Sequence, residues 1–519
     1  MEAGEKTYTH KRMPRGGHVE IMDTTLRDGE QTSGVSFSKQ EKLNIAKLLL
    51  TELHVPRIEV ASARVSTGEK ETVKAVLDWA HRHGRAHQIE VLGFLDKGES
   101  VKWISDVGGS VINLLSKGSE NHCIHQLKQT PEQHAQAIKE EVRRAREAGM
   151  KVNLYLEDWS NGAKNSPDYV YYIMDAIKDE EIERFMLPDT LGILTPTQTF
   201  YYVKRMVTRY PGLHFDFHAH NDYDLAAGNV FAAIQAGVKG VHCTINGLGE
   251  RAGNATLSST VAVIHDHLGL VTGIDEKKIN KVSHIVESFS GISVPPNKPI
   301  IGENVFTQCA GVHADGDSKN NLYYNDLLPE RFGREREYAL GKTSGKANIR
   351  KNLESLGIEL DEEDVRKVTE RVIELGDRKE IVTQSDLPYI VADVVKHSRM
   401  KCRVKIVNYY LSLAKGLSPT ATICIEIDGK RYQESATGDG QYNAFVKAVR
   451  KVYERRLKLK FPTLVSYQVN IPPGGRTDAL VQATIGWEYN GQTLKTRGLD
   501  PDQTEAAIQA TIKMLNMIQ

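Results

Sequence analysis

Two histidines separated by one residue, His218 and His220, stand in the stretch HAHND and are the first candidates for chemistry. Side chains alternate along a β-strand, so both imidazoles would lie on one face of such a strand. Asp28 would add a carboxylate oxygen, and Asn254 or water could complete the set. These ligands suit a catalytic divalent ion (zinc, manganese, magnesium or cobalt) that keeps open positions for substrate. The alternative is an ordinary polar lining of the protein interior.

Arg27 directly precedes Asp28 in the stretch DTTLRDGEQT. A fixed guanidinium there could bind a keto or carboxylate oxygen of a substrate. Its alternative role is a structural ion pair to Glu30 or Glu157. Glu157, in YLEDWSN, could accept a proton or orient a base, although a carboxylate at the end of a strand is also a common member of a salt bridge. The glycines of NGLGERAGN could simply build a turn.

Short apolar and β-branched runs recur along the first half of the chain, and a longer amphipathic helical pattern follows each of them. The runs are VEIMDTT from Val19, RIEVAS from Arg57, IEVLGF from Ile89, VINLLS from Val111, KVNLYLED from Lys151, RFMLPDT from Arg184, HFDFHAHND from His214 and GVHCTING from Gly240. Eight parallel βα units within roughly 250 residues predict a (β/α)8 TIM barrel over residues 1–290. A doubly wound open sheet is disfavoured because no G-x-G-x-x-G follows the first run.

Barrel enzymes carry their sites at the carboxyl ends of the strands. The chemistry-bearing residues of this chain gather just past those predicted ends, and they are Arg27, Asp28, Glu157, Thr190, His218, His220 and Asn254. This convergence predicts one site at the mouth of the barrel.

The rest of the chain has a different pattern. Residues 291–400 show loops and helices with little strand signal and predict a helical linker region. Residues 401–519 show a strand, a strand, a helix, then three strands and a helix, which predicts a compact α+β domain with an internal near-repeat.

Composition limits the possible partners and compartments. Lys plus Arg equals Asp plus Glu at 67 each, so no overall field attracts nucleic acid or an anionic membrane. The five cysteines are scattered without a C-x-x-C pair, as expected of reduced thiols. No signal-peptide core or membrane-spanning run is present. These features predict a soluble cytoplasmic protein with small-molecule partners.

The motifs DTTLRDGEQT, HAHND and NGLGERAGN, in this order, together with GVHADG, resemble those of the metal-dependent acyl-CoA condensing enzymes, namely the 2-isopropylmalate, homocitrate and citramalate synthases. The resemblance covers nearly the whole chain. It implies that Asp28, His218 and His220 bind a divalent metal, that Arg27 and Thr190 hold an α-keto acid, and that Glu157 and His313 deprotonate the methyl group of acetyl-CoA. The enolate would then attack the keto carbon, and thioester hydrolysis would make the reaction irreversible.

His313 lies outside the predicted barrel, so the linker must fold over a barrel mouth. In this family it does so across a dimer interface, which implies a catalytic homodimer. Asp315, Asn321, Leu322 and Tyr323 match the family's acetyl-CoA contacts, although Leu322 and Tyr323 could equally be packing residues. Hydroxymethylglutaryl-CoA lyase shares the fold and metal motif but carries a cysteine in the loop where NGLGERAGN has none.

Within the family the resemblance is closest to the citramalate synthases, which use pyruvate. In their pattern Leu92, Leu115 and Tyr155 surround carbon-3 of the substrate. Forcing an isopropyl group among these large side chains would cost about 1 to 3 kcal/mol of packing energy, which disfavours 2-oxoisovalerate. The two leucines could alternatively be only barrel core. A 2-isopropylmalate synthase using 2-oxoisovalerate is the alternative enzyme. Homocitrate synthase is disfavoured because these residues offer no cation. A non-catalytic amino-acid sensor is the alternative of another class.

The C-terminal part resembles the regulatory domain that binds a branched-chain amino acid and inhibits these synthases. A Gly-rich loop, TGDGQYNAF, starts a predicted helix whose free N–H groups could hold the effector carboxylate. Tyr442 would line that pocket, and the loop near Asp478 matches the family's second loop. The effector would be isoleucine for a citramalate synthase and leucine for a 2-isopropylmalate synthase. The domain could alternatively be only a dimerisation module.

Overall fold

The computed structural model of the protein describes residues 17–318, 322, 324–377, 382–394, 403–470, 481–490 and 492–518. The chain divides into two compact units. One runs to Phe306 and includes Tyr324–Arg336, and the other comprises Thr307–Tyr323 and Glu337–Gln519. Each unit is described by itself below.

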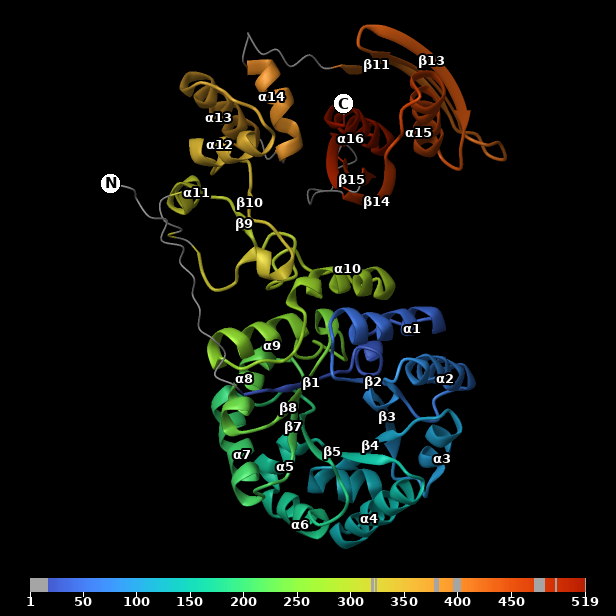
Figure 1. The fold of residues 1–519 in the computed structure, drawn as a ribbon, viewed down its shortest axis with the longest axis vertical. Coiled ribbons are helices and arrows are strands. Elements are labelled where there is room, and N and C mark those ends of the chain that lie inside the picture. The colour runs from blue at the N-terminus through green and yellow to red at the C-terminus, as the bar shows by residue number, and fades with distance from the viewer. Residues whose placement is uncertain are drawn as a thin grey trace. The chain divides into compact units, whose positions relative to one another are not determined.

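The first unit is built around a closed barrel of eight parallel strands (Figure 1). The strands are β1 (Glu20–Asp23), β2 (Arg57–Ser62), β3 (Ile89–Phe94), β4 (Val111–Lys117), β5 (Lys151–Glu157), β6 (Arg184–Asp189), β7 (Phe215–Ala219) and β8 (Gly240–Cys243). Neighbours in sequence pair with each other, and β1 pairs with β8 to close the ring. The (β/α)8 barrel predicted from the sequence is confirmed.

Helices surround the strands on the outside of the ring (Figure 1). They are α1 (Lys39–Lys47), α2 (Thr67–Arg82), α3 (Glu99–Asp106), α4 (Pro131–Glu147), α5 (Trp159–Asn165), α6 (Pro167–Ile177), α7 (Pro196–Arg209), α8 (Ala226–Ala236), α9 (Leu257–Val263) and α10 (Ile279–Ser290). Their apolar faces and the outward faces of the strands form one large hydrophobic core.

Helix α4 shows how the sequence sets such a helix. Thr130 caps its start in a capping box with Gln133, and Pro131 occupies a first-turn position where no N–H is needed. Ala135, Ile138, Val142 and Ala145 are buried at helical spacing, so a single stripe of the helix faces the core.

Inside the barrel a layer of buried charged and amide side chains lies between the strands. Arg57 contacts Glu90 at 3.0 Å and Asp216 at 2.8 Å, and Asn113 donates to Glu59 at 2.8 Å. These side chains are at most 5 % exposed. Because an unpaired buried charge is costly, each carboxylate of this layer has to meet a donor.

The second unit begins with short helices around a small apolar cluster. Its elements are α11 (Gly311–Ser318), α12 (Lys346–Ser355), α13 (Glu362–Asp377) and α14 (Leu387–Val394), with the two-residue strands β9 (Thr307–Gln308) and β10 (Glu337–Tyr338). Ile349, Leu353, Val368 and Val372 are buried between α12 and α13.

Two antiparallel three-stranded sheets follow, each with a helix after it. The first has β11 (Val404–Ser412), β12 (Thr420–Ile427), β13 (Lys430–Thr437) and α15 (Gln441–Lys451). The second has β14 (Thr463–Asn470), β15 (Val481–Tyr489), β16 (Gln492–Asp500) and α16 (Gln503–Met517). The predicted α+β architecture is confirmed, but the prediction of two strands in the first half is wrong. Strand β13 was missed because its sequence, KRYQESAT, is almost wholly polar.

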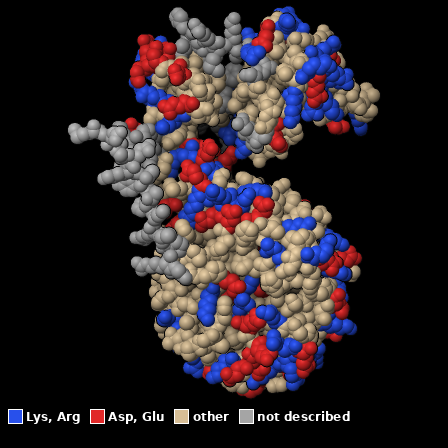
Figure 2. Space-filling view, in the orientation of Figure 1, with Lys and Arg blue, Asp and Glu red and all other residues tan. Residues whose placement is uncertain are grey.

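Lys and Arg side chains mingle with Asp and Glu on the visible surface of the molecule (Figure 2), in keeping with the equal numbers of the two signs. Among the described residues, no helix has the length and apolar character needed to cross a membrane.

Candidate metal centre and keto acid site

Three ligand-bearing side chains meet at the carboxyl ends of β1 and β7. His218 lies on β7, His220 follows that strand, and Asp28 lies in the turn after β1, where its N–H donates to Thr24 O at 2.9 Å. Asp28 Oδ2 lies 3.2 Å from His218 Nε2 and 3.8 Å from His220 Nε2. All three residues are buried, and their ligand atoms lie within 4.8 Å of one another. The alternation of side chains along a strand, predicted from HAHND, accounts for the common direction of the two imidazoles.

Several buried polar atoms around this group have no hydrogen-bond partner among the residues that the structure describes. They include Asp28 Oδ1 and Asn254 Oδ1. Asn254 is bridged to His220 through the backbone, and its amide nitrogen donates to Leu248 O at 3.1 Å. Buried acceptors normally have a partner. The unpaired Asp28 and Asn254 oxygens are therefore consistent with a cation that these two residues and the two histidines would hold. The donors present, two imidazoles with carboxylate and amide oxygens, suit a divalent ion.

Burial and neighbouring charges set the ionisation of two members of this group, Asp28 and His220. Burial opposes ionisation of Asp28, but Arg27 and the two histidines together hold its pKa well below the usual range. Burial, followed by the neighbouring His218, lowers the pKa of His220 to about 4. The carboxylate is therefore ionised and the His220 imidazole neutral near pH 7, as metal ligation requires.

The glycine-rich loop after β8 positions Asn254. Gly249 has φ +153°, and a Cβ there would collide with the Asn254 amide. Gly253 has φ +83°, and a Cβ there would collide with the carbonyl of Gly247. These glycines thus allow a close approach of the loop to Asn254, which is more than the simple turn considered from the sequence.

Arg27 is held by three side chains at once. Its Nε donates to Glu59 at 2.6 Å, Nη1 lies 3.4 Å from Asp28 Oδ2, and Nη2 donates to Tyr155 OH at 3.5 Å. Each terminal nitrogen carries two N–H groups, so both retain capacity for a bound carboxylate. Glu59, fully buried on β2, was not predicted, and its only sequence signal is a carboxylate inside the apolar run RIEVAS.

The alternative ion-pair partners considered for Arg27 are wrong. Glu30 pairs with the buried Lys42 at 2.7 Å, and Glu157 pairs with Lys117 at the end of β4. Glu157 itself stands at the end of β5 with its side chain 28 % exposed. The salt-bridge role weighed for Glu157 is therefore present, and the carboxylate also remains open to solvent at the strand ends.

Thr190 follows β6, and its hydroxyl accepts from the N–H of Asp158 at 2.9 Å. Its carbonyl accepts from Arg251 at 2.7 Å. These contacts hold the residue in the ring of strand ends that also carries Glu157.

Leu92, Leu115 and Tyr155 come together inside the barrel. They form a small cluster with Met22 and Met186, separate from the main hydrophobic core. Leu115 is the partly buried member, while Tyr155 is only 3 % exposed. The Tyr155 hydroxyl also contacts His242 Nδ1 at 3.2 Å. This apolar wall adjoins Arg27, whose guanidinium lies 5.8 Å from the Tyr155 ring centre.

The predicted residues of the second unit lie in local surroundings of their own. His313 and Asp315 lie on α11, and His313 Nδ1 contacts Gln308 Oε1 at 3.1 Å. Leu322 is 66 % exposed. Asn321, Tyr323 and Asp478 lie outside the described residues.

Tyr442 lies on α15. Its hydroxyl contacts Thr511 Oγ1 at 2.8 Å, and its ring stacks on Tyr467 at 5.4 Å between centroids. Burial raises the pKa of Tyr442 above its ordinary value. A role in binding an effector stays a prediction for this residue.

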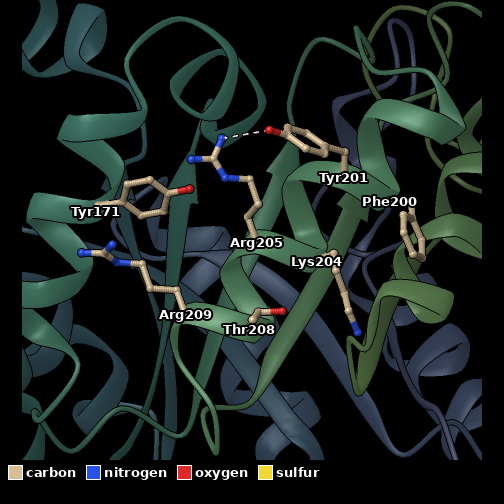
Figure 3. Close-up of a pocket in the computed structure, with 7 residues that line it drawn as sticks. All are labelled: Tyr171, Phe200, Tyr201, Lys204, Arg205, Thr208 and Arg209. Atoms are coloured by element: carbon tan, nitrogen blue, oxygen red, sulfur yellow. Dashed lines mark hydrogen bonds between the residues drawn. The ribbon is translucent and has the colours of Figure 1, made fainter.

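A surface pocket lies away from the strand ends, on the outer faces of α6 and α7 (Figure 3). Arg205 lies 5.5 Å above the rings of both Tyr171 and Tyr201, and Arg209 lies 4.6 Å above Tyr171. The chain's own guanidinium groups thus cover the aromatic faces that a ligand would use. None of the predicted site residues lines this pocket.

Comparison with known proteins covers the chain from residue 18 to its end. The HMGL-like family matches residues 18–286, the homocitrate synthase post-HMGL domain-like family matches residues 300–380, and the LeuA allosteric (dimerisation) domain matches residues 381–519.

Full-length relatives carry two different names. The putative (R)-citramalate synthase CimA of Methanopyrus kandleri is 34% identical over 506 residues, which is 96% of each chain. The 2-isopropylmalate synthase of Methanocaldococcus jannaschii is 33% identical over 509 residues, covering 96% of this chain and 94% of its own. The (R)-citramalate synthase CimA of the same organism is 32% identical over 503 residues, covering 96% and 99%.

Both kinds of synthase are similar to this chain to nearly the same degree, so identity does not choose the keto acid. The barrel, the linker and the terminal domain each match the corresponding part of such enzymes. The chain therefore belongs to the HMGL-like family, among the acetyl-CoA-condensing α-keto acid synthases that carry a LeuA domain.

Proposed function

We propose that the protein is a citramalate synthase, which condenses acetyl-CoA with pyruvate to give (R)-citramalate and CoA in the isoleucine branch of branched-chain amino-acid biosynthesis. The observation that carries this choice is the packed wall of Leu92, Leu115 and Tyr155 beside Arg27. A keto acid whose carboxylate meets Arg27 would direct its side chain toward that wall. A methyl group needs little room there, whereas an isopropyl group would have to displace Tyr155.

The size of this discrimination follows from packing. Forcing extra carbon atoms into a rigid apolar site costs roughly 1 to 3 kcal/mol, or about 5- to 150-fold in relative rate. Tyr155 is rigid here because its hydroxyl has Arg27, His242 and Glu59 within hydrogen-bonding distance.

In the proposed mechanism Asp28, His218, His220 and Asn254 hold a divalent cation. When bound, such an ion would act as a Lewis acid toward the keto oxygen. Arg27 binds the substrate carboxylate through the free N–H groups of its terminal nitrogens, and it adds positive charge where negative charge develops.

Glu157 and His313 are the proposed groups for the proton step, which general-base catalysis typically accelerates by about 10² to 10⁴-fold. Together they remove one proton from the methyl group of acetyl-CoA, and Glu157 holds that proton. The enolate carbon then bonds to the keto carbon of pyruvate. The resulting alkoxide takes up a proton, and water cleaves the thioester to release CoA. Lys117 balances the Glu157 charge before the proton arrives.

The deciding experiment measures CoA release with a thiol reagent for pyruvate and for 2-oxoisovalerate under identical conditions. We expect kcat/KM to favour pyruvate by about 5- to 150-fold, and we expect Tyr155→Ala to lower that ratio. A wild-type preference for 2-oxoisovalerate would refute the proposal and support the alternative, a 2-isopropylmalate synthase, which is also a name carried by full-length relatives. Retained turnover in Asp28→Ala and His218→Ala would count against the metal mechanism.

We also propose that the protein is a homodimer whose LeuA domain responds to an amino acid. The support is the match of residues 381–519 to the LeuA allosteric (dimerisation) domain. Light scattering should give twice the chain mass of 57.9 kDa, and isoleucine should inhibit CoA release more strongly than leucine. A monomer, or a stronger response to leucine, would contradict these two expectations respectively.

A further inference from the structure

A chain of hydrogen bonds runs through the barrel interior beneath Arg27. Arg27 Nη2 lies 3.5 Å from Tyr155 OH, which lies 3.2 Å from His242 Nδ1, and His242 Nε2 lies 3.3 Å from Asp216 Oδ2. Tyr155, His242 and Asp216 are at most 3 % exposed. The four residues come from four different parts of the barrel, so the chain joins the keto acid site to the polar layer below it.

The Asp216 end of this hydrogen-bond series determines which atoms donate and which accept along it. Both terminal nitrogens of Arg57 donate to Asp216 Oδ2, at 3.0 and 2.8 Å, so the two side chains form a buried ion pair. An ionised carboxylate only accepts, so His242 Nε2 must carry the hydrogen that it donates.

The neutral imidazole then has its lone pair on Nδ1. With Nε2–H donated to Asp216 and the Tyr155 hydroxyl facing Nδ1, each ring nitrogen of this neutral form has one partner. Nδ1 accepts the Tyr155 hydroxyl hydrogen, and the phenol oxygen is left to accept from Arg27. One ionised aspartate therefore orders every donor up to the substrate-binding guanidinium.

A competing acceptor for the Tyr155 hydroxyl is Glu59 Oε2, at 3.4 Å. Glu59 already accepts from Arg27 Nε and from Asn113. The His242 contact is shorter, and among the described residues the only other polar contact of that imidazole is with Asp216. His242 is therefore the nearest of the three partners that hold the Tyr155 hydroxyl.

We propose that His242 is a positioning residue that sets keto acid selectivity by anchoring the hydroxyl of Tyr155, the side chain that limits the room for the substrate's alkyl group. This inference rests on the proposed function, because it assigns Tyr155 to the keto acid wall. His242 is not among the residues proposed to hold the substrate or the cation, and it acts through Tyr155.

The test compares His242→Leu, which removes both polar contacts, with His242→Gln, whose amide offers a donor and an acceptor to the same two neighbours. The measured quantity is the ratio of kcat/KM for pyruvate to kcat/KM for 2-oxoisovalerate. We expect His242→Leu to lower this ratio by about three- to tenfold, the range of one neutral hydrogen bond. His242→Gln should stay within about twofold of the wild type, on the same scale.

A double-mutant cycle with Tyr155→Phe separates anchoring from general packing. Tyr155→Phe keeps the ring and removes the hydroxyl together with its contacts to His242, Arg27 and Glu59, so it should shift the selectivity ratio at least as much as His242→Leu does. Adding His242→Leu to Tyr155→Phe should change the ratio little. If His242→Leu fails to fold, the Tyr155→Phe shift alone still decides. An unchanged ratio in Tyr155→Phe, or fully additive effects in the cycle, would overturn the inference.

Metal content is measured in every variant, because the His242 ring lies 5.4 Å from that of His218. Unchanged metal content with a shifted ratio supports the inference, while a loss of metal that accounts for the activity change overturns it. A wild-type preference for 2-oxoisovalerate would refute the proposed function by itself. The coupling between positions 242 and 155 would still be measurable with that substrate, so the two failures remain distinguishable.

Discussion

Replacing Arg27 by methionine should destabilise the barrel as well as abolish keto acid binding. Glu59 is fully buried, and Arg27 Nε, at 2.6 Å, is the cation that meets it. Burial opposes the charge on Arg27, yet Glu59 and Asp28 together raise its pKa above the ordinary value. Methionine fills a similar volume but leaves the Glu59 carboxylate with two neutral donors, Asn113 at 2.8 Å and the Tyr155 hydroxyl at 3.4 Å.

Breaking a buried ion pair by removing one partner costs about 3 to 5 kcal/mol, because the remaining charge stays buried without compensation. For a barrel of this size each kcal/mol lowers the unfolding midpoint by about 2 to 4 °C, so a drop of roughly 6 to 20 °C is expected. The Asp28 contact at 3.4 Å is longer and nearer to the cation site, so it should contribute less.

The matched variant is Arg27→Met combined with Glu59→Gln, which removes both charges. We expect the double variant to regain most of the lost midpoint, since a neutral amide is far cheaper to bury than a carboxylate. Neither variant should show keto acid turnover. The double variant thereby separates the structural role of Arg27 from its chemical role.

Thermal unfolding followed by tryptophan fluorescence, in the presence of a chelator, provides the assay. The first transition is compared between variants, because a chain with more than one unit does not unfold in two states. An Arg27→Met midpoint within about 2 °C of the wild type, which is less than 1 kcal/mol on this scale, would show that Glu59 does not depend on Arg27. Equal losses in the single and double variants would refute the reasoning in the same way.

Three further predictions concern other parts of the barrel. Burial, followed by Lys117, lowers the pKa of His134 to about 4 from 6.5, so its stabilising effect is complete above pH 6.5 and is lost as the pH falls toward 4. When the pH falls from 7 to 5, the free energy of unfolding should therefore drop by about 2 kcal/mol more for the wild type than for His134→Gln. Thermal midpoints at the two pH values measure this difference. Gly249→Ala should displace Asn254 and weaken divalent metal affinity by about tenfold in a titration, whereas Gly34→Ala, with φ +84° but open space around its Cβ, should not. Removing the metal with a chelator should stop CoA release and lower the thermal unfolding midpoint of the barrel. Metal restored at about 100 times its Kd should raise the free energy of unfolding by about 2.7 kcal/mol.

The barrel was predictable because its signal is local and repeated. Each strand is a short apolar run followed by a helical period, and eight such units leave few alternatives. The same locality explains the error at β13, where Lys430–Thr437 pairs along its whole length with β12 but carries mostly polar side chains. Pairing there depends on the neighbouring strand, which the pattern of the segment itself does not reveal.

The ligand group was predictable for a different reason. HAHND contains its own geometry, since alternation along one strand places both imidazoles together. The partners of Arg27 were mispredicted because they come from across the barrel. Glu59 and Tyr155 lie 32 and 128 residues away in the chain, and only the closure of the strands brings them to one guanidinium.

These cross-barrel contacts explain how the site can be rigid before substrate binds. Glu59 fixes Arg27 from one side, and the ordered chain through Tyr155 and His242 fixes it from another. The orientation of the remaining N–H groups of the Arg27 guanidinium is therefore fixed before substrate binds. A carboxylate that arrives there meets donors whose orientation the fold has already settled, so little reorganisation opposes binding or the development of charge. The buried polar layer is in this sense part of the site, although none of its groups is proposed to bind the substrate.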